Sequence, residues 1–186
     1  MIEESYKLFG LGAIIAIWAG SGYVLLRFRN DDLPTLSKHV NQSRIAYLVL
    51  GIALTINAIG FLIFNLKWFA PLLGLPYYFD YLFWAIAVST FLAGWVPDIG
   101  KSMLHFVHVI SAYLGGLTLL SLALLTAIIP QESWLVRGYA LFTSLILAAG
   151  LIYMRNLQKK GHRFVKFQAL FVLTYHLLML LVIFSY

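Results

Sequence analysis

Long apolar runs alternate with short polar stretches along the whole chain. Each of six runs has about 20 residues, the length with which an α-helix crosses the hydrocarbon core of a bilayer. Because a backbone inside lipid must satisfy its own hydrogen bonds, such runs form helices. The pattern therefore predicts six transmembrane helices, at Leu8–Phe28, Ile45–Leu66, Tyr77–Val96, Ser102–Ile129, Trp134–Met154 and Val165–Ser185.

The composition agrees with a protein embedded in lipid. Of the 186 residues, 62% are apolar and only 11% are charged, and the mean hydropathy is +0.88. A soluble domain would carry about 25% charged residues. The first apolar run is too long for the core of a signal peptide, and no small-residue cleavage site follows it. We expect an all-α fold, a polytopic membrane protein in which residues 1–186 form a single six-transmembrane-helix bundle.

Cysteine and proline usage narrow the possibilities further. The chain has no cysteine, which excludes disulfide, thiolate and iron–sulfur chemistry. Pro71, Pro76, Pro97 and Pro130 fall between the predicted helices, where a missing N–H costs little. We expect Pro97 to end the third helix and Asp98 to help start the fourth, because an acid at a helix N-terminus accepts free backbone N–H groups.

The positive charges are distributed unevenly over the predicted loops. Six helices divide the loops between two sides of the membrane; ten of the 13 Lys and Arg residues fall on one side, and Lys7, Lys67 and Arg137 on the other. The positive-inside rule makes the first side cytoplasmic, which predicts a multi-pass protein of the cytoplasmic membrane with both termini outside. Basic loops against anionic lipid headgroups account for the net charge of +6 without any nucleic-acid partner.

The first predicted helix carries small residues, Gly12, Ala16 and Gly20, at four-residue spacing. Small residues at this spacing let two helices approach closely. The partner is either another helix of the same chain or the same helix of a second copy.

Polar and small residues also gather on one face of the fourth predicted helix. They follow one another at steps of three and four residues, which places them on a single helical face between apolar flanks. Such a face should look into the bundle, where it either lines a ligand site or packs against a neighbouring helix. The residues of this stripe are Lys101, His105, His108, Ser111, Gly115 and Thr118.

With a rise of about 1.5 Å per residue along each predicted helix, polar residues of other helices lie at a membrane depth similar to that of His105 and His108. Polar residues inside a membrane are costly and mark functional sites. An amide in mid-helix, as at Asn57, must find a hydrogen-bond partner on another helix. His39 is expected to be solvated in the first cytoplasmic loop, and His162 is expected at the lipid headgroups, in the basic loop before the last helix. We expect a polar pocket in the cytoplasmic leaflet formed by Ser21, Asn57, Ser89, His105, His108 and His176, with Asp98 and Lys101 at its mouth.

Four functions fit this polar layer. With His105, His108 and His176 as zinc ligands and Asp98 as base, it would be the centre of a membrane hydrolase that acts on lipid headgroups. With His108 and His176, or His105 and His162, as axial ligands, it would hold a b-type haem for electron transfer. Without either group, it would bind or process a lipid or a small amphiphile. The fourth possibility is that the chain is a purely structural membrane subunit with no site of its own.

One stretch resembles a known family. AGWVPDIGKSMLHFVHVISAY, from Ala93 to Tyr113, resembles the Pro-acid…His signature at the start of the fourth helix in the DUF998 family of six-helix membrane proteins, which is distantly similar to the Frag1/DRAM/Sfk1 group. LPTLSKH and KKGHRF are similar to two loop segments of that family. The pattern carries over onto Ser37, Pro97, Asp98 and His105. Trp and Val stand before Pro97 in place of the usual Phe, the interval from Asp98 to His105 is short, and outward termini depart from the family.

The resemblance implies the six-helix fold, and its distant relatives suggest lipid handling, which is an analogy at the level of the fold. The leading interpretation is a membrane protein whose pocket binds or processes a lipid or small amphiphile, or a small subunit of a larger membrane complex. Expected partners are membrane lipids and other membrane subunits.

Overall fold

The computed structural model describes residues 3–28, 33, 35–98, 102–129, 132–159 and 165–186, and these contain helices and no strands. The prediction of an all-α fold is confirmed. Two single-turn 3-10 helices, Glu4–Tyr6 and Tyr77–Phe79, precede α1 and α5, and the π-helix Asn65–Phe69 joins α3 to α4. The α-helices are α1 (Lys7–Arg27), α2 (Leu36–Val40), α3 (Arg44–Phe64), α4 (Ala70–Leu73), α5 (Asp80–Trp95), α6 (Met103–Ile128), α7 (Trp134–Lys159) and α8 (Val165–Ser185).

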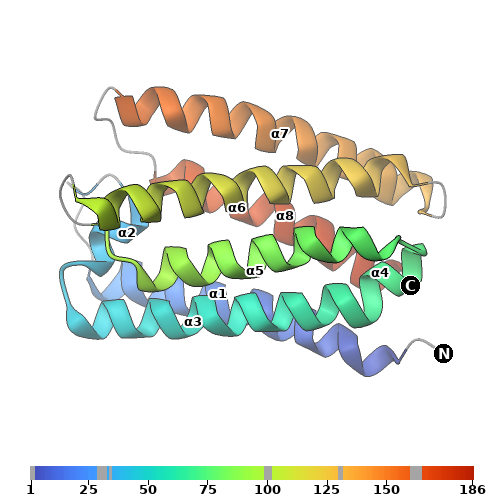
Figure 1. Cartoon of the computed structure of the whole chain (residues 1–186), viewed down its shortest axis with the longest axis horizontal. Coiled ribbons are helices and arrows are strands. Elements are labelled where there is room, and N and C mark those ends of the chain that lie inside the picture. The colour runs from blue at the N-terminus through green and yellow to red at the C-terminus, as the bar shows by residue number, and fades with distance from the viewer. Residues whose placement is uncertain (1–2, 29–32, 34, 99–101, 130–131, 160–164) are drawn as a thin grey trace.

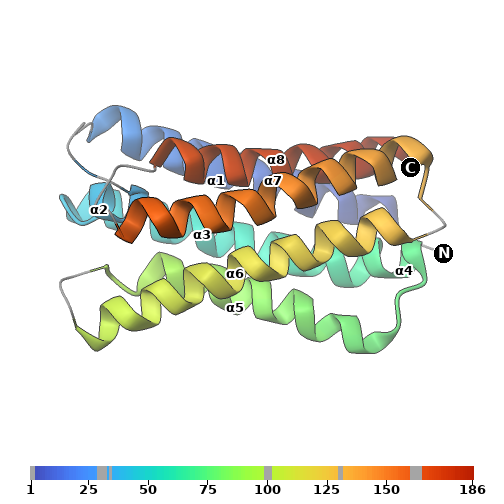
Figure 2. The same ribbon diagram turned by 90° about the horizontal axis from the view of Figure 1, so that it is seen from above.

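The long helices run side by side along one axis (Figure 1). Each packs against the next long helix in the chain, from α1 through α3, α5, α6 and α7 to α8, and α8 also packs against α1. The bundle is therefore closed on itself (Figure 2). Helix α2 lies at one end of the bundle, while α4 and both chain termini lie at the other.

Five helical segments of the described residues are long and apolar enough to cross a membrane. Helix α5 has 16 residues and is shorter than these five, although it packs between α3 and α6. The multi-pass character expected from the sequence agrees with this architecture. The five segments are Glu4–Arg27, Arg44–Leu73, Met103–Ile128, Trp134–Leu157 and Val165–Ser185.

The second predicted helix ended at Leu66, but the helical path continues to Leu73. It passes through the π-helix, in which the N–H of Ala70 donates to the carbonyl of Asn65, five residues earlier. Pro71 follows in the first turn of α4, where a missing N–H is tolerated. The prediction that Pro71 lies between helices is wrong, because the wide π-helical turn creates a new helix start directly before the proline.

The chain leaves the helical conformation after α5 as predicted. Val96 has extended backbone angles, with φ −94° and ψ 114°, because the ring of Pro97 disfavours helical geometry in the preceding residue. The N-cap of α6 is Ser102, whose side-chain oxygen accepts from the N–H of His105 at 3.3 Å. Asp98 is therefore not the cap of this helix, and its carboxylate has other partners.

Helix α2 was not predicted, because its five residues are too few to leave an apolar period. It begins at Thr35, whose side chain accepts from the N–H of Lys38 at 3.2 Å. His39 is 4% exposed, and its Nδ1–H donates to the carbonyl of Thr35 at 2.8 Å. The expectation that His39 is solvated is wrong, because α2 turns this side chain towards the protein.

Small residues bring α1 and α3 into close contact. A Cβ atom added to Gly20 would collide with the Cβ of Ala53, and one added to Gly60 would lie 3.0 Å from the Cβ of Ala13. By contrast, an added Cβ on Gly12 would meet nothing within 4 Å. Of the small residues on the first predicted helix, Gly20 thus takes part in packing within the chain, whereas Gly12 faces outward.

Candidate functional site

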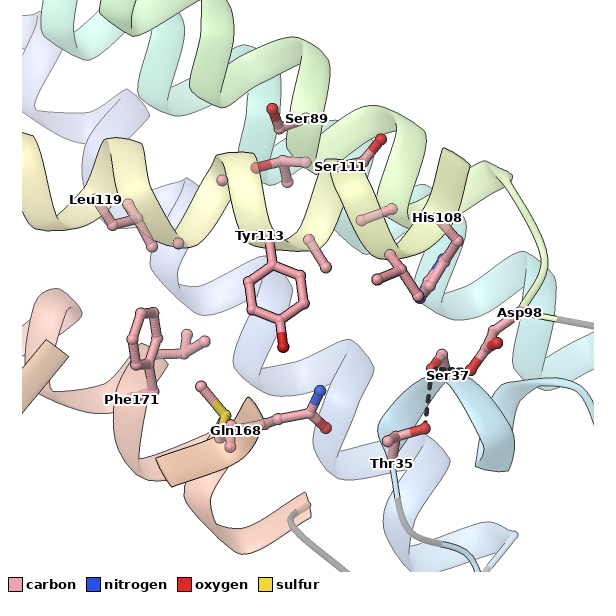
Figure 3. Close-up of a pocket in the computed structure, with 18 of the residues that line it drawn as sticks. Thr35, Ser37, Ser89, Asp98, His108, Ser111, Tyr113, Leu119, Gln168 and Phe171 are labelled. Atoms are coloured by element: carbon pink, nitrogen blue, oxygen red, sulfur yellow. Dashed lines mark hydrogen bonds between the residues drawn. The ribbon is translucent and has the colours of Figure 1, made fainter. Parts of the chain in front are cut away.

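A two-lobed cavity extends from α2 into the bundle, and Figure 3 shows its first lobe. Lobe one has a volume of about 270 Å³ and lies among α5, α6, α7 and α8. Lobe two has a volume of about 340 Å³ and lies among α1, α3, α5 and α8. The lobes meet at a shared wall, which consists of Ser37, Leu54, Thr90, Ala93, Asp98, His108, Ala112, Leu119, Gln168 and Val172.

Asp98 lies at the α2 end of this wall and is 7% exposed. Its carboxylate accepts hydrogen bonds from His105 Nδ1 at 2.6 Å and from Ser37 Oγ at 3.2 Å, and it forms an ion pair with Lys38 Nζ at 3.3 Å. Its backbone carbonyl accepts from Lys38 Nζ at 3.0 Å and from the Asn41 amide at 2.9 Å. These five residues, the Asp98 cluster, join α2 to the start of α6.

Two opposing effects act on the ionisation of Asp98. Burial alone would raise the pKa of this carboxyl, since a charge is costly away from water. The hydrogen bond from His105 and the positive charge of Lys38 oppose burial and outweigh it, so the pKa lies below its usual value. Asp98 is therefore ionised at neutral pH, and its charge is balanced by its neighbours in the cluster.

Side chains from α3 and α6 satisfy the backbone carbonyls at the open end of α5. The Tyr47 hydroxyl donates to the carbonyl of Trp95 at 2.6 Å, and His108 Nδ1 lies 2.8 Å from the carbonyl of Val96. A carbonyl only accepts, so His108 carries a proton on Nδ1 and, when neutral, has a lone pair on Nε2. Irregular backbone at this depth is tolerated because these partners replace water.

His176 lies deeper in lobe two, where it contacts α1. The indole N–H of Trp18 donates to His176 Nδ1 at 2.9 Å, and the ring of Phe61 stacks on the imidazole at a centroid distance of 5.6 Å. Since the indole nitrogen only donates, Nδ1 accepts, and the neutral ring carries its proton on Nε2. His108 and His176 therefore line the same lobe in opposite tautomers.

Two amides of the α3 segment also line lobe two. The Asn57 side chain donates to the carbonyl of Ala13 on α1 at 3.0 Å, which confirms the prediction that Asn57 bonds another helix. Asn65, in the π-helix, is 2% exposed, and its side-chain oxygen is buried without a hydrogen-bond partner. Lobe two thus has polar groups spaced along an apolar wall.

The other residues expected at the pocket fall into three groups. Ser21 lines lobe two. Ser89 lines lobe one and is 2% exposed, and its hydroxyl is buried without a partner. His105 belongs to the Asp98 cluster and lines neither lobe. Lys101 and His162 lie outside the described residues, as does the pairing of His105 with His162.

The described residues contain no group of three or more His, Asp or Glu side chains that could hold a metal ion. The zinc arrangement expected from His105, His108 and His176 is therefore not assembled there. Of the three histidines, His176 is the least suited to ligate a metal ion. One of its ring nitrogens accepts from Trp18, and the other carries the proton of the neutral ring. In this arrangement neither ring nitrogen of the neutral His176 offers the free lone pair that an axial haem ligand needs.

Several residues of the site were missed in the sequence. Trp18 and Tyr47 lie within predicted helices, and Lys38 and Asn41 lie in or beside the unpredicted α2. Gln168 was visible as an isolated polar residue near the start of the last helix, and its side-chain oxygen accepts from the N–H of Leu36 at 3.3 Å. The indole N–H of Trp18 and the hydroxyl of Tyr47 can be recognised as part of the site only when their hydrogen-bond partners are known.

Comparison of the chain with protein-family models, with curated proteins and with solved structures gives no match. The resemblance to the DUF998 family therefore stays a prediction.

Proposed function

We propose that this chain is a six-span protein of the cytoplasmic membrane whose two-lobed cavity binds a lipid or a small amphiphile. The observation that carries the proposal is the distribution of polarity in the cavity. Polar side chains of the shared wall, including Ser37, His108 and Gln168, lie near α2. Away from it, apolar side chains such as Leu151, Phe171 and Ile17 predominate, and this division matches an amphiphile.

The family resemblance is part of this proposal. It singled out four positions, and three of them, Ser37, Asp98 and His105, are in direct contact. The fourth, Pro97, ends α5 directly before Asp98. These contacts join segments that are 61 residues apart in the chain, so they support a common structural role for the two segments that hold Ser37 and Asp98.

The six-span arrangement is supported by the place of α5 in the bundle. The 3-10 turn Tyr77–Phe79 runs directly into the 16 residues of α5. At about 1.5 Å per residue the two together approach the 30 Å thickness of the hydrocarbon core. With α5 as a span, α2 and the most basic loops lie on the cytoplasmic side, and the cavity opens from the cytoplasmic leaflet.

Labelling of single cysteines tests this orientation. The natural chain has no cysteine, and Gln42, in the turn after α2, and Ser5, before α1, are both exposed. In intact cells Gln42→Cys should resist an impermeant maleimide and Ser5→Cys should react, because the positive-inside rule places the α2 end in the cytoplasm. Both should react after the cells are permeabilised. The opposite pattern in intact cells would reverse the topology.

Filling the shared wall tests the binding function. Ala93 lines both lobes, so Ala93→Phe should reduce the lipid that copurifies with the protein about tenfold, a loss of about 1.4 kcal/mol in binding free energy. Ala149→Phe is the matched control, since Ala149 is exposed and lines neither lobe. Native mass spectrometry of both variants gives the bound lipid. Equal lipid content in Ala93→Phe, Ala149→Phe and the natural protein would refute a ligand in this cavity.

A further inference from the structure

The two lobes of the cavity diverge from one polar junction. Their shared wall contains five polar residues, and the junction is formed by Ser37, Thr90, Asp98, His108 and Gln168. From there, lobe one continues along α6, α7 and α8, and lobe two continues along α1, α3 and α8. A ligand with one polar group and two apolar chains would match the shape of this two-lobed cavity.

The charges of the lining argue for an uncharged polar group. Among the described lining residues there is one carboxylate, Asp98, and no lysine or arginine. An anionic phosphate at the junction would lie beside the Asp98 carboxylate, and the neighbouring Lys38 is already paired with that carboxylate, so its desolvation would be costly. A cationic group would find Asp98 already bonded to Ser37, Lys38 and His105.

The hydrogen-bonding groups of the junction fit a hydroxyl. His108 uses Nδ1–H on the carbonyl of Val96, which leaves the Nε2 lone pair of the neutral ring as an acceptor. Gln168 uses its side-chain oxygen on the N–H of Leu36, which leaves the two N–H donors of the amide. In Figure 3 the side chains of His108 and Gln168 project into the space between α6 and α8. A hydroxyl both donates and accepts, so it can use one group of each kind.

We propose that the ligand is an uncharged two-chain lipid with a hydroxyl head, of the diacylglycerol type. The hydroxyl lies at the junction between His108 and Gln168, and one acyl chain enters each lobe. The inference rests on the proposed function, since it names the ligand class of the same cavity.

Competition among three lipids tests this ligand class in the purified full chain. A fluorescent diacylglycerol in detergent micelles is displaced by dioleoylglycerol, by monooleoylglycerol, which has one chain, or by dioleoyl phosphatidic acid, which is anionic. Dioleoylglycerol should bind about tenfold more tightly than either of the other two, a difference of about 1.4 kcal/mol. If none of the three binds, the diacylglycerol-type ligand is refuted, and the proposed function itself is wrong if Ala93→Phe also leaves the copurified lipid unchanged. If monooleoylglycerol or phosphatidic acid binds as tightly as dioleoylglycerol, only the two-chain neutral ligand is refuted.

Two glycines allow each lobe to be filled separately. An added Cβ on Gly115, which lines lobe one, would meet only the Cβ of Ser89, at 3.5 Å, and one on Gly22, which lines lobe two, would meet nothing within 4 Å. Gly115→Leu and Gly22→Leu should each weaken dioleoylglycerol about tenfold while monooleoylglycerol stays within about twofold, because one chain can use the open lobe. Gly138→Leu is the control, since its added Cβ also meets nothing within 4 Å and it lines neither lobe.

The pattern over both variants decides the outcome. If each variant weakens both lipids equally, one chain runs through both lobes and the inference is wrong. If one variant weakens dioleoylglycerol and the other has no effect, only one lobe holds a chain and the inference is again wrong. Should one variant fail to fold, the other variant and the three-lipid comparison still test the proposal.

Discussion

Replacing Asp98 with asparagine should lower the free energy of unfolding by about 2–3 kcal/mol, since hydrogen bonds to a charged group contribute about 1.5–3 kcal/mol. The carboxylate accepts from Ser37 and His105 and pairs with Lys38, and an amide keeps only part of these contacts. Lys38 and His105 are partly exposed, so water takes over some of the loss. Thermal unfolding in detergent, followed by circular dichroism, measures the change.

In the same variant, the free energy of unfolding should also depend less on pH than in the natural protein. Because the folded protein depresses the pKa of Asp98, its contribution is present above the unfolded value of about 3.9 and disappears as pH falls through the folded value. The natural protein should therefore lose stability below about pH 4 more steeply than Asp98→Asn. Glu4→Gln is the control, because it removes the more exposed ion pair of Glu4 with Lys7, which water and salt screen. Parallel acid profiles in the natural protein and Asp98→Asn would show that the cluster contributes no charge-dependent stability.

Phe64→Ala should destabilise the bundle by about 2–3 kcal/mol, less than the 3–5 kcal/mol typical of a water-soluble core, because the helices of a membrane protein separate into lipid and not into water. Phe64 has no exposed surface and stacks on Trp68 at a centroid distance of 5.2 Å. The loss is one of packing, since the surrounding rings cannot fill the space. Steric trapping in bicelles measures the unfolding free energy.

Phe91→Ala is the matched control for that experiment. Phe91 is 45% exposed on α5, where lipid replaces the lost side chain, so the change should stay below about 0.5 kcal/mol, as at most surface positions. Equal effects at Phe64 and Phe91 would contradict the packing of α1, α3 and the π-helix described above.

The sequence predicts most of the helices, because the length of an apolar run is a local property. It also predicts that Pro97 ends a helix and that Asn57 forms a hydrogen bond with a neighbouring helix. Both follow from the residue type alone, because proline disfavours helical geometry in the residue before it and a buried amide needs a partner. It does not predict α2 or the π-helix, whose short lengths carry no period. The partners of Asp98 and His176 are equally hidden: Ser37 precedes Asp98 by 61 residues, and Trp18 precedes His176 by 158.

The stripe on α6 illustrates the limit of a periodic pattern. Its spacing correctly places His108, Ser111 and Gly115 on the wall of a cavity. Spacing does not reveal that His105, one turn earlier, binds Asp98 instead. A helical period gives the direction of a side chain, whereas its role depends on which polar group the neighbouring segment supplies.

The packing of α8 against α1 determines when the cavity can form during biosynthesis. A ribosome delivers α1 to the membrane before α8, so lobe two lacks one wall until α8 has been synthesised. Until then the indole N–H of Trp18 has no His176 to bond. A bilayer offers it no water in exchange, so we expect an insertion chaperone or a lipid molecule to occupy the gap beside the nascent first helix.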